Sequence, residues 1–217
     1  SLIRSEATGY GTVYFAEEML KHAGRSFDGL RVSVSGSGNV AQYSVEKAMM
    51  LGAKVITVSD SSGTVVDEDG FTTEKLAILM DVKNNLRGRV SDYAERVKAT
   101  FIPNVRPWHV PVDVALPCAT QNELDEKDAA TLIKNGVFCV AEGANMPSTA
   151  GAIKLFDEGG VMFAPGKASN AGGVATSGLE MSQNAIRLSW PREEVDARLL
   201  EIMKAIHGSC LQYGKRK

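Results

Sequence analysis

The sequence predicts an α/β fold: a doubly wound, mostly parallel sheet with helices on both faces and two long C-terminal helices. Short apolar runs rich in β-branched residues alternate along the chain with segments of helical period, which is typical of a parallel sheet covered by helices. A glycine-rich turn, Gly36-Ser37-Gly38, separates the first predicted strand from a helix. Nothing strand-like follows residue 164.

The first predicted elements form a strand–turn–helix–strand unit. A helix over Glu6–Ala23 precedes it. The unit itself comprises a strand at Leu30–Ser35, a helix at Asn39–Leu51 and a strand at Ala53–Ser59. Gly24 and Gly52 follow the two helices, as expected of helix C-termini. Gly63 and Gly70 then flank a small hairpin or loop.

The alternation continues to the last predicted strand. Helices are expected at Thr73–Leu86, Val90–Lys98, Glu123–Asn135 and Thr149–Glu158. Strands are expected at Ala99–Ile102, Val112–Leu116, Val137–Ala141 and Val161–Ala164. Two long helices, Ala168–Leu188 and Arg192–Gln212, end the chain and are divided by Trp190-Pro191.

Composition excludes several classes of function. The 217 residues are 44% hydrophobic and 23% charged, with a net charge of −2. That charge argues against a nucleic-acid partner, which needs a basic face. No apolar stretch approaches the length of a membrane span, and the N-terminal residues carry no signal-peptide pattern. The three cysteines are widely spaced, which favours reduced thiols in the cytoplasm and no metal site.

The glycine turn predicts a dinucleotide site. Gly36 permits the tight turn, and Gly38 lets the backbone approach a diphosphate. Ala41, where a third glycine often stands, is small enough for close helix–strand packing. Backbone N–H groups and the dipole of the following helix would hold the anion. The alternative is a purely structural strand–helix turn.

The end of the second strand leaves the kind of dinucleotide open. Asp60 is placed where a carboxylate usually binds the adenosine ribose of NAD(H). Ser61, Lys83 and Arg89 offer instead the donors and positive charge that a 2′-phosphate requires. The cations favour NADP(H), with NAD(H) as the alternative. They are also compatible with a solvated helix face.

Several stretches together resemble the hexameric, NADP-type glutamate dehydrogenases of bacteria. The stretches are RSEATGYG (4–11), SGSGNVAQ (35–42), SDSSG (59–63), LPCATQNEL (116–124), VAEGANMP (140–147) and APGKASNAGGVATSGLEMSQN (164–184). The resemblance implies a Rossmann-like domain spanning residues 1–217. About residues 1–23 would form a hinge-proximal helix, and 168–217 the C-terminal helices. A substrate domain carrying the catalytic lysine and aspartate would be absent, so no catalytic residue is expected here.

The residue pattern and the resemblance together assign a set of cofactor-binding residues. They are Thr8, Gly36, Ser37, Gly38, Asn39, Val40, Asp60, Ser61, Lys83, Arg89, Ala119, Thr120 and Asn145. The resemblance places Thr8 at the nicotinamide carboxamide, Asn145 at the nicotinamide ribose, and Ser61 and Lys83 at the 2′-phosphate. Thr8 and Asn39 have an alternative role as helix N-caps. For Thr120 and Asn145 the alternative is turn chemistry.

The resemblance also implies a substrate site and a reaction. Arg4 and Ser177 would bind the side-chain carboxylate of glutamate or 2-oxoglutarate, and Val174 would pack against the substrate. The complete enzyme would be a homohexamer. This chain alone would be a monomer or weak dimer that binds cofactor without catalysis. The alternatives are a dehydrogenase for another amino acid, such as leucine or phenylalanine, and a non-catalytic nucleotide-binding or interaction module.

Overall fold

A mostly parallel sheet forms the centre of the computed structural model, which describes residues 2–214. Within those residues it has seven strands, in the order β4-β3-β2-β1-β5-β6-β7. They are β1 (Arg31–Val34), β2 (Lys54–Asp60), β3 (Gly63–Val66), β4 (Thr100–Pro103), β5 (Val114–Leu116), β6 (Cys139–Ala141) and β7 (Met162–Ala164). β2, β1, β5, β6 and β7 are parallel, whereas β3 is antiparallel to both of its neighbours. The predicted fold class is confirmed. The stretch between Gly63 and Gly70 is β3 followed by a turn, so the hairpin predicted there as one alternative is wrong, and β3 pairs instead with β2.

Alternate residues of the strands belong to two separate hydrophobic cores, one on each face of the sheet. On β5, Val114 and Leu116 lie in the larger core, whereas Ala115 lies in the smaller one. On β2, Val55 belongs to the larger core and Ile56 to the smaller. Both faces are apolar because helices cover both, as expected of a doubly wound sheet.

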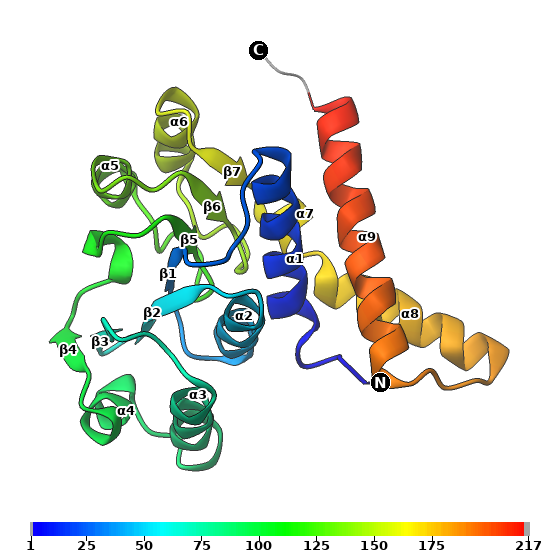
Figure 1. Ribbon diagram of the computed structural model, residues 1–217, viewed down its shortest axis with the longest axis horizontal. Helices are drawn as coiled ribbons and strands as arrows, with labels where there is room; N and C mark the ends of the chain where they lie inside the picture. Colours follow the sequence, from blue (N-terminus) through cyan, green and yellow to red (C-terminus); the bar gives the residue numbers. More distant parts are fainter. Residues whose placement is uncertain (1, 215–217) are drawn as a thin grey trace.

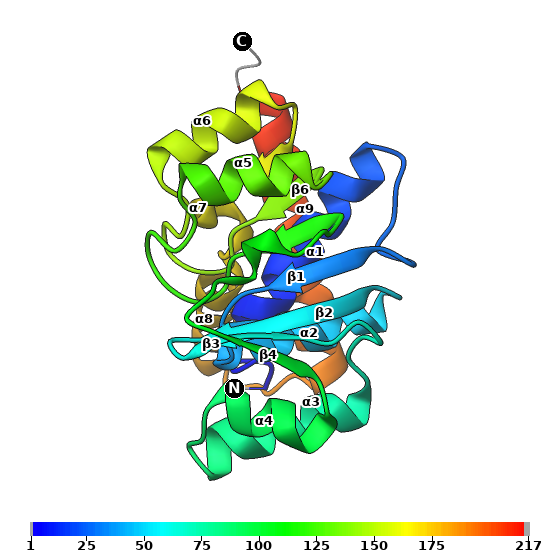
Figure 2. The same cartoon turned by 90° about the vertical axis from the view of Figure 1, so that its left-hand side faces the viewer.

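Helices cover the two faces and extend beyond one of them (Figures 1 and 2). The larger core is packed by α1 (Ala7–His22), α2 (Asn39–Met50), α3 (Thr73–Met80) and α4 (Val90–Val97). The smaller core is packed by α5 (Glu126–Lys134), α6 (Ala150–Glu158) and a 3₁₀ turn at Pro107–His109. A short helix α7 (Gly166–Ser169) leads to α8 (Gly172–Ile186) and α9 (Arg192–Tyr213), which lie outside α1. None of the described helices is both long and apolar enough to cross a membrane.

The start of α8 crosses α1 at very short range. A Cβ at Gly172 would overlap the carbonyl oxygen of Ala7, and a Cβ at Gly11 would lie 2.8 Å from the Cα of Gly172. Glycine on both helices is therefore required for this approach. The crossing fixes α8 against the first turns of α1.

A buried lysine ties α2 to α1 and α9. The ammonium of Lys47 lies 4.0 Å from the centre of the Tyr10 ring and 3.5 Å from the carboxylate of Asp196. The hydroxyl of Tyr14 donates to the same carboxylate at 2.7 Å. An opposite charge and an aromatic face together offset the cost of burying the ammonium. The outer helix α9 is thereby joined to the two helices that lie on the sheet.

The predicted helix Ala168–Leu188 is wrong as a single element. It is two helices, because α7 ends at Ser169 and α8 begins at Gly172. In the break, the side-chain amide of Asn170 donates to the carbonyl oxygen of Ala144 at 3.1 Å. This contact between distant segments has no signature in the helical period.

Two other helix boundaries also differ from the prediction. The predicted helix Glu123–Asn135 begins at Glu126, because the carboxylate of Asp125 caps it by accepting from two N–H groups of its first turn. The predicted helix Thr73–Leu86 changes at Asp81–Asn85 into a π-helical turn. The first difference places Glu123 in a loop.

Replacing the crossing glycine is expected to destabilise the protein. Gly172→Ala forces α8 away from Ala7, and we expect a loss of about 1–3 kcal/mol in the free energy of unfolding, measured by urea denaturation. The control is Gly178→Ala on the same helix, where a Cβ meets no atom within 4 Å. There we expect a gain of up to about 1 kcal/mol from helix propensity. Equal effects of the two substitutions would contradict the close crossing.

Candidate functional site

Three adjacent hollows follow the carboxyl ends of β1, β2, β5 and β6 and together form one groove. The inner hollow, about 560 Å³, lies beside α1 and the start of α8. The middle hollow, about 360 Å³, lies over the glycine turn, and the outer hollow, about 610 Å³, lies beyond the end of β2. Ala119 lines all three. Ligands of open α/β sheets bind at this edge, where chains leaving neighbouring strands diverge.

The glycine turn forms the floor of the middle hollow. Gly36 has a φ of +83°, and its N–H donates to the Ser59 hydroxyl at 2.9 Å. A Cβ at Gly36 would lie 3.0 Å from the carbonyl oxygen of Cys118, so the position requires glycine. A Cβ at Gly38 would meet no protein atom within 4 Å. Gly38 therefore presents an open backbone face, as expected of a residue that a ligand approaches.

The N-terminus of α2 is available to an anion. Gly38 is the N-cap of α2, and no side chain caps the helix. The first N–H groups of a helix have no intrahelical partner, and the helix dipole is positive at this end. Ser37, Asn39 and Val40 line the same hollow. The site thus combines a helix N-terminus that no side chain caps with a turn made of glycine and serine.

The capping alternatives for Thr8 and Asn39 are both wrong. Asn39 is the first residue of α2 rather than its N-cap. Thr8 is the second residue of α1, whose N-cap is Glu6. Thr8 lines the inner hollow, and Asn39 lines the middle one. Both polar side chains therefore stand where a ligand would lie.

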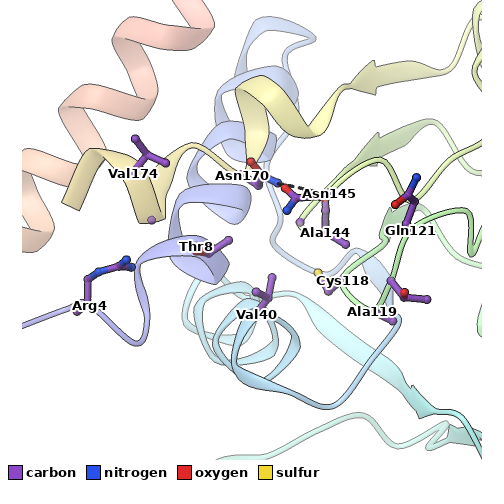
Figure 3. Close-up of a pocket in the computed structure, with 13 residues that line it drawn as sticks. Arg4, Thr8, Val40, Cys118, Ala119, Gln121, Ala144, Asn145, Asn170 and Val174 are labelled. Carbon is purple, nitrogen blue, oxygen red and sulfur yellow. Dashed lines mark hydrogen bonds between the residues drawn. The ribbon is translucent and has the colours of Figure 1, made fainter. Parts of the chain in front are cut away.

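The inner hollow brings together residues from five distant parts of the sequence (Figure 3). The predicted residues that line it are Arg4, Thr8, Val40, Ala119, Thr120, Asn145 and Val174. Asn170 also lines it and was not predicted; its amide donates to the side-chain oxygen of Asn145 at 2.9 Å. The sequence signal that could have identified it is an asparagine two positions before the glycine-rich start of α8. Gln121 and Cys118 were also missed, and burial raises the pKa of the Cys118 thiol to about 12.

A buried carboxylate holds the loop that carries Asn145. Glu142 is 3% exposed, and its side chain accepts from the N–H groups of Ser148 at 3.2 Å and Gly166 at 2.7 Å. Its carbonyl oxygen accepts from the Ser169 hydroxyl at 2.6 Å. These bonds connect the chain after β6 to the chain after β7. The hydrogen bonds of Glu142 therefore help to set the position of Asn145.

Asp60, at the end of β2, has both carboxylate oxygens engaged inside the protein. Oδ1 accepts from the N–H and hydroxyl of Ser62, at 2.8 and 2.5 Å. Oδ2 accepts from the Val90 N–H at 3.0 Å and from the Lys83 ammonium at 3.2 Å. Burial raises the pKa of Asp60, but these hydrogen bonds outweigh burial and hold the pKa below its ordinary value. The carboxylate is bonded to groups of its own protein through both oxygens. It therefore has no oxygen free to accept from the hydroxyls of a ribose.

Two cations lie beside this end of the groove, against Asp60 and Ser61, but neither is among the residues that line the three hollows. Lys83 bridges Asp60 and the carbonyl oxygen of Gly88, which lies 2.9 Å away. The exposed Arg89 donates from Nη1 to the Ser61 hydroxyl at 2.8 Å. A solvated helix face is therefore the wrong description of Lys83, which is paired and mostly covered. Asn104, Arg106 and Glu123 also line the outer hollow and were not predicted as site residues.

The predicted substrate residues are only partly brought together. Arg4 and Val174 line the inner hollow, and Val174 is 78% exposed. Arg4 lies 3.8 Å from the carboxylate of Glu180 on α8. Ser177 does not line the described hollow, and its hydroxyl donates to the carbonyl oxygen of Gly173 within its own helix at 3.1 Å.

The chain matches a known protein family along its whole length. The family model described as Glutamate/Leucine/Phenylalanine/Valine dehydrogenase matches residues 1–217. The chain belongs to this family. It is 66% identical over 214 residues to an NADP-specific glutamate dehydrogenase of Salmonella typhimurium, covering 99% of this chain and 48% of that protein. A relative from Xylanibacter ruminicola, 59% identical over the same shares, is described as an NAD(P)-specific glutamate dehydrogenase.

Solved structures agree with the family assignment. The crystal structure of Plasmodium falciparum glutamate dehydrogenase superposes with a TM-score of 0.96 at 50% identity, covering 98% of this chain and 46% of that one. The chain thus spans about half the length of the relatives it matches. The resemblance to NADP-type glutamate dehydrogenases that the sequence motifs indicated is confirmed.

The hydrogen bonds of Asp60 predict a pH-dependent stability. Asp60→Asn weakens the contacts with Lys83 and Val90, so we expect a loss of about 1–3 kcal/mol in unfolding free energy at pH 7. Because the folded-state pKa is lowered, this stabilisation is full above 3.8, the ordinary pKa, and is lost as the pH falls through the lowered value. The difference between wild type and variant should therefore shrink in acid, measured by thermal unfolding from pH 7 to pH 2.5. A difference that is constant with pH would contradict the ionic role.

Proposed function

We propose that this chain is the cofactor-binding half of an NADP-dependent glutamate dehydrogenase, which interconverts glutamate with 2-oxoglutarate and ammonium. Residues 1–217 are its dinucleotide-binding domain. The substrate domain, with the catalytic lysine and aspartate, lies outside this chain. The observation that carries the proposal is at the edge of the outer hollow. Arg89 donates at 2.8 Å to Ser61, which lines that hollow beside an Asp60 carboxylate whose oxygens are already bonded.

The groove matches an extended dinucleotide in three parts. The diphosphate lies in the middle hollow, on the backbone of Gly36 and Gly38 and at the uncapped start of α2. The adenosine occupies the outer hollow, next to Ser37 and Ser61. The nicotinamide end occupies the inner hollow. The loop at Ala119, which lines all three hollows, runs alongside the whole ligand.

The outer hollow favours NADP(H) over NAD(H). Recognition of the ribose hydroxyls of NAD(H) needs a free carboxylate at the end of β2. Asp60 offers none, because Ser62, Val90 and Lys83 occupy it. A 2′-phosphate needs charged and neutral donors, and the guanidinium of Arg89 and the hydroxyl of Ser61 are adjacent. NAD(H) remains the alternative cofactor, in keeping with the NAD(P)-specific relative.

The inner hollow positions the reacting end of the cofactor. The bound nicotinamide supplies or accepts the hydride. Thr8 offers a hydroxyl to its carboxamide, and Asn145, held by Asn170, offers an amide to its ribose. Arg4 and Ser177 bind the side-chain carboxylate of the substrate, and Val174 packs against it. Closure of the substrate domain over the groove would exclude water from the reaction.

The proposal extends to the assembly and location of the complete protein. It is a homohexamer that works in the cytoplasm on small-molecule substrates, without nucleic-acid, membrane or metal partners. This chain alone is expected to be a monomer or weak dimer. It binds cofactor and does not turn over substrate, because the groups that move protons lie in the other domain.

Arg89→Ala is expected to separate the two cofactors. The substitution removes the guanidinium next to Ser61, so NADPH binding should weaken about tenfold, whereas NADH binding should stay within a factor of two. The measurement is calorimetric titration of the chain with each cofactor at low salt. Arg96→Ala, an exposed arginine of α4 paired with Asp81, is the control and should change neither affinity. Equal losses for both cofactors would contradict a 2′-phosphate role.

Gly38→Ala tests the diphosphate position. The new methyl group has free space in the unliganded protein, so the melting temperature should stay within a few degrees of wild type. It occupies the face that the diphosphate must approach, so NADPH affinity should fall by about 100-fold or more, a steric loss of about 3 kcal/mol. Full retention of NADPH binding would place the diphosphate elsewhere.

A further inference from the structure

One buried carboxyl group stands behind the loop that all three hollows share. Glu123 is 3% exposed and lies between β5 and α5. Its Oε1 accepts from the N–H of Ala119 at 2.9 Å and from the N–H of Thr120 at 3.3 Å. Within the described part of the chain, this oxygen is the one acceptor recorded for these two N–H groups. The loop backbone is therefore held by a side chain rather than by a sheet or a helix.

The chain that leaves β1 is bonded to the start of the same loop. The hydroxyl of Ser35 accepts from the Cys118 N–H at 2.8 Å, and the nearby hydroxyl lowers the pKa of the Glu123 carboxyl group. Ser35 directly precedes Gly36, the first glycine of the turn. Ser35 thus joins the chain leaving β1 to the chain leaving β5, next to the loop that Glu123 holds.

The backbone of Glu123 is fixed independently of its carboxyl group. Its carbonyl oxygen accepts from Arg106 Nη1 at 2.6 Å and from the indole N–H of the fully buried Trp108 at 3.1 Å. The next N–H, that of Leu124, donates to the carbonyl oxygen of Pro147 at 3.0 Å. The core therefore sets the position of the carboxyl group, and the carboxyl group sets the position of the loop.

Burying the Glu123 carboxyl group costs free energy that an apolar residue would not cost. Burial raises the pKa of Glu123, and the nearby Ser35 hydroxyl and the hydrogen bonds from Ala119 and Thr120 lower it only in part. The nearby guanidinium of Arg106 lowers it further without restoring the ordinary value. An apolar residue at this position would avoid that cost, but it would leave two loop N–H groups without an acceptor.

We propose that Glu123 is a positioning residue for the dinucleotide, acting through the Ala119–Thr120 backbone. The inference rests on the proposed function, because it concerns the groove in which the dinucleotide lies. With the carboxyl group in place, the loop is ordered before the cofactor arrives, so binding does not include the cost of ordering it. With the acceptor removed, each binding event must order the loop.

Two substitutions separate the acceptor from the charge. Glu123→Asp keeps the charge but is one methylene too short to reach both N–H groups. Glu123→Gln loses the charge but keeps an oxygen at the right distance. We expect the dissociation constant for NADPH, from fluorescence titration, to rise at least tenfold in Glu123→Asp and to stay within about threefold of wild type in Glu123→Gln. The matched control is Glu158→Asp, at an exposed position of α6, which should bind as wild type does.

Amide hydrogen exchange reads the loop directly. In the unliganded wild type, the Ala119 and Thr120 amides should exchange at least tenfold more slowly than the amide of the exposed Gln121. This measurement does not depend on the folding of any variant. Exchange at both amides as fast as at Gln121 overturns the inference. So does a folded Glu123→Asp that binds NADPH as wild type does, or a Glu123→Gln that binds NADPH much more weakly than Glu123→Asp, which would assign the effect to charge. A wild-type chain that binds no NADPH contradicts the proposed function instead.

Discussion

The groove depends on how closely the chain leaving β1 passes the chain leaving β5. At Gly36 the two segments are in contact, since a Cβ there would lie 3.0 Å from the Cys118 carbonyl oxygen and 3.1 Å from the Cα of Ala119. This approach needs glycine in a left-handed conformation. Because the segments meet, one loop borders the helix end, the inner hollow and the outer hollow at once. A longer separation would divide the groove into unconnected surface depressions.

Acids that are buried or largely covered shape the polar edge of the sheet. Asp60 ends β2, Glu123 follows β5 and Glu142 follows β6, and each accepts from backbone N–H groups of neighbouring segments. Hydrogen bonds to a charged acceptor are stronger than neutral ones, and burial strengthens them further. The groups left facing the groove are then mostly backbone, hydroxyl, amide and guanidinium donors. Such a lining suits an anionic ligand, although the chain as a whole carries a net charge of −2.

The inner hollow has a second constraint, imposed by the helices outside the sheet. One of its walls is α1 and another is the start of α8, and their separation is set by the crossing of Gly11 and Gly172. The buried ammonium of Lys47 on α2 and the carboxylate of Asp196 hold α9 against α1 and α2. The position of Val174 at the mouth of the hollow therefore depends on packing far from the glycine turn.

The sequence by itself determined the features that depend on neighbouring residues. The alternation of strands and helices, the glycine turn and the family resemblance are all encoded in local pattern, so the fold class and most residues around the groove could be predicted. Tertiary structure decided the roles of the polar groups. Asp60 has the spacing of a ribose ligand, yet Lys83 and Val90, more than twenty positions away, engage it. Thr8 and Asn39 look like caps, but Thr8 is the second residue of α1 and Asn39 the first residue of α2. Glu123 has the pattern of a helix residue and becomes a buried acceptor. A hydrogen-bonding group acts on whichever partner the fold brings within about 3 Å, and sequence spacing does not record that partner.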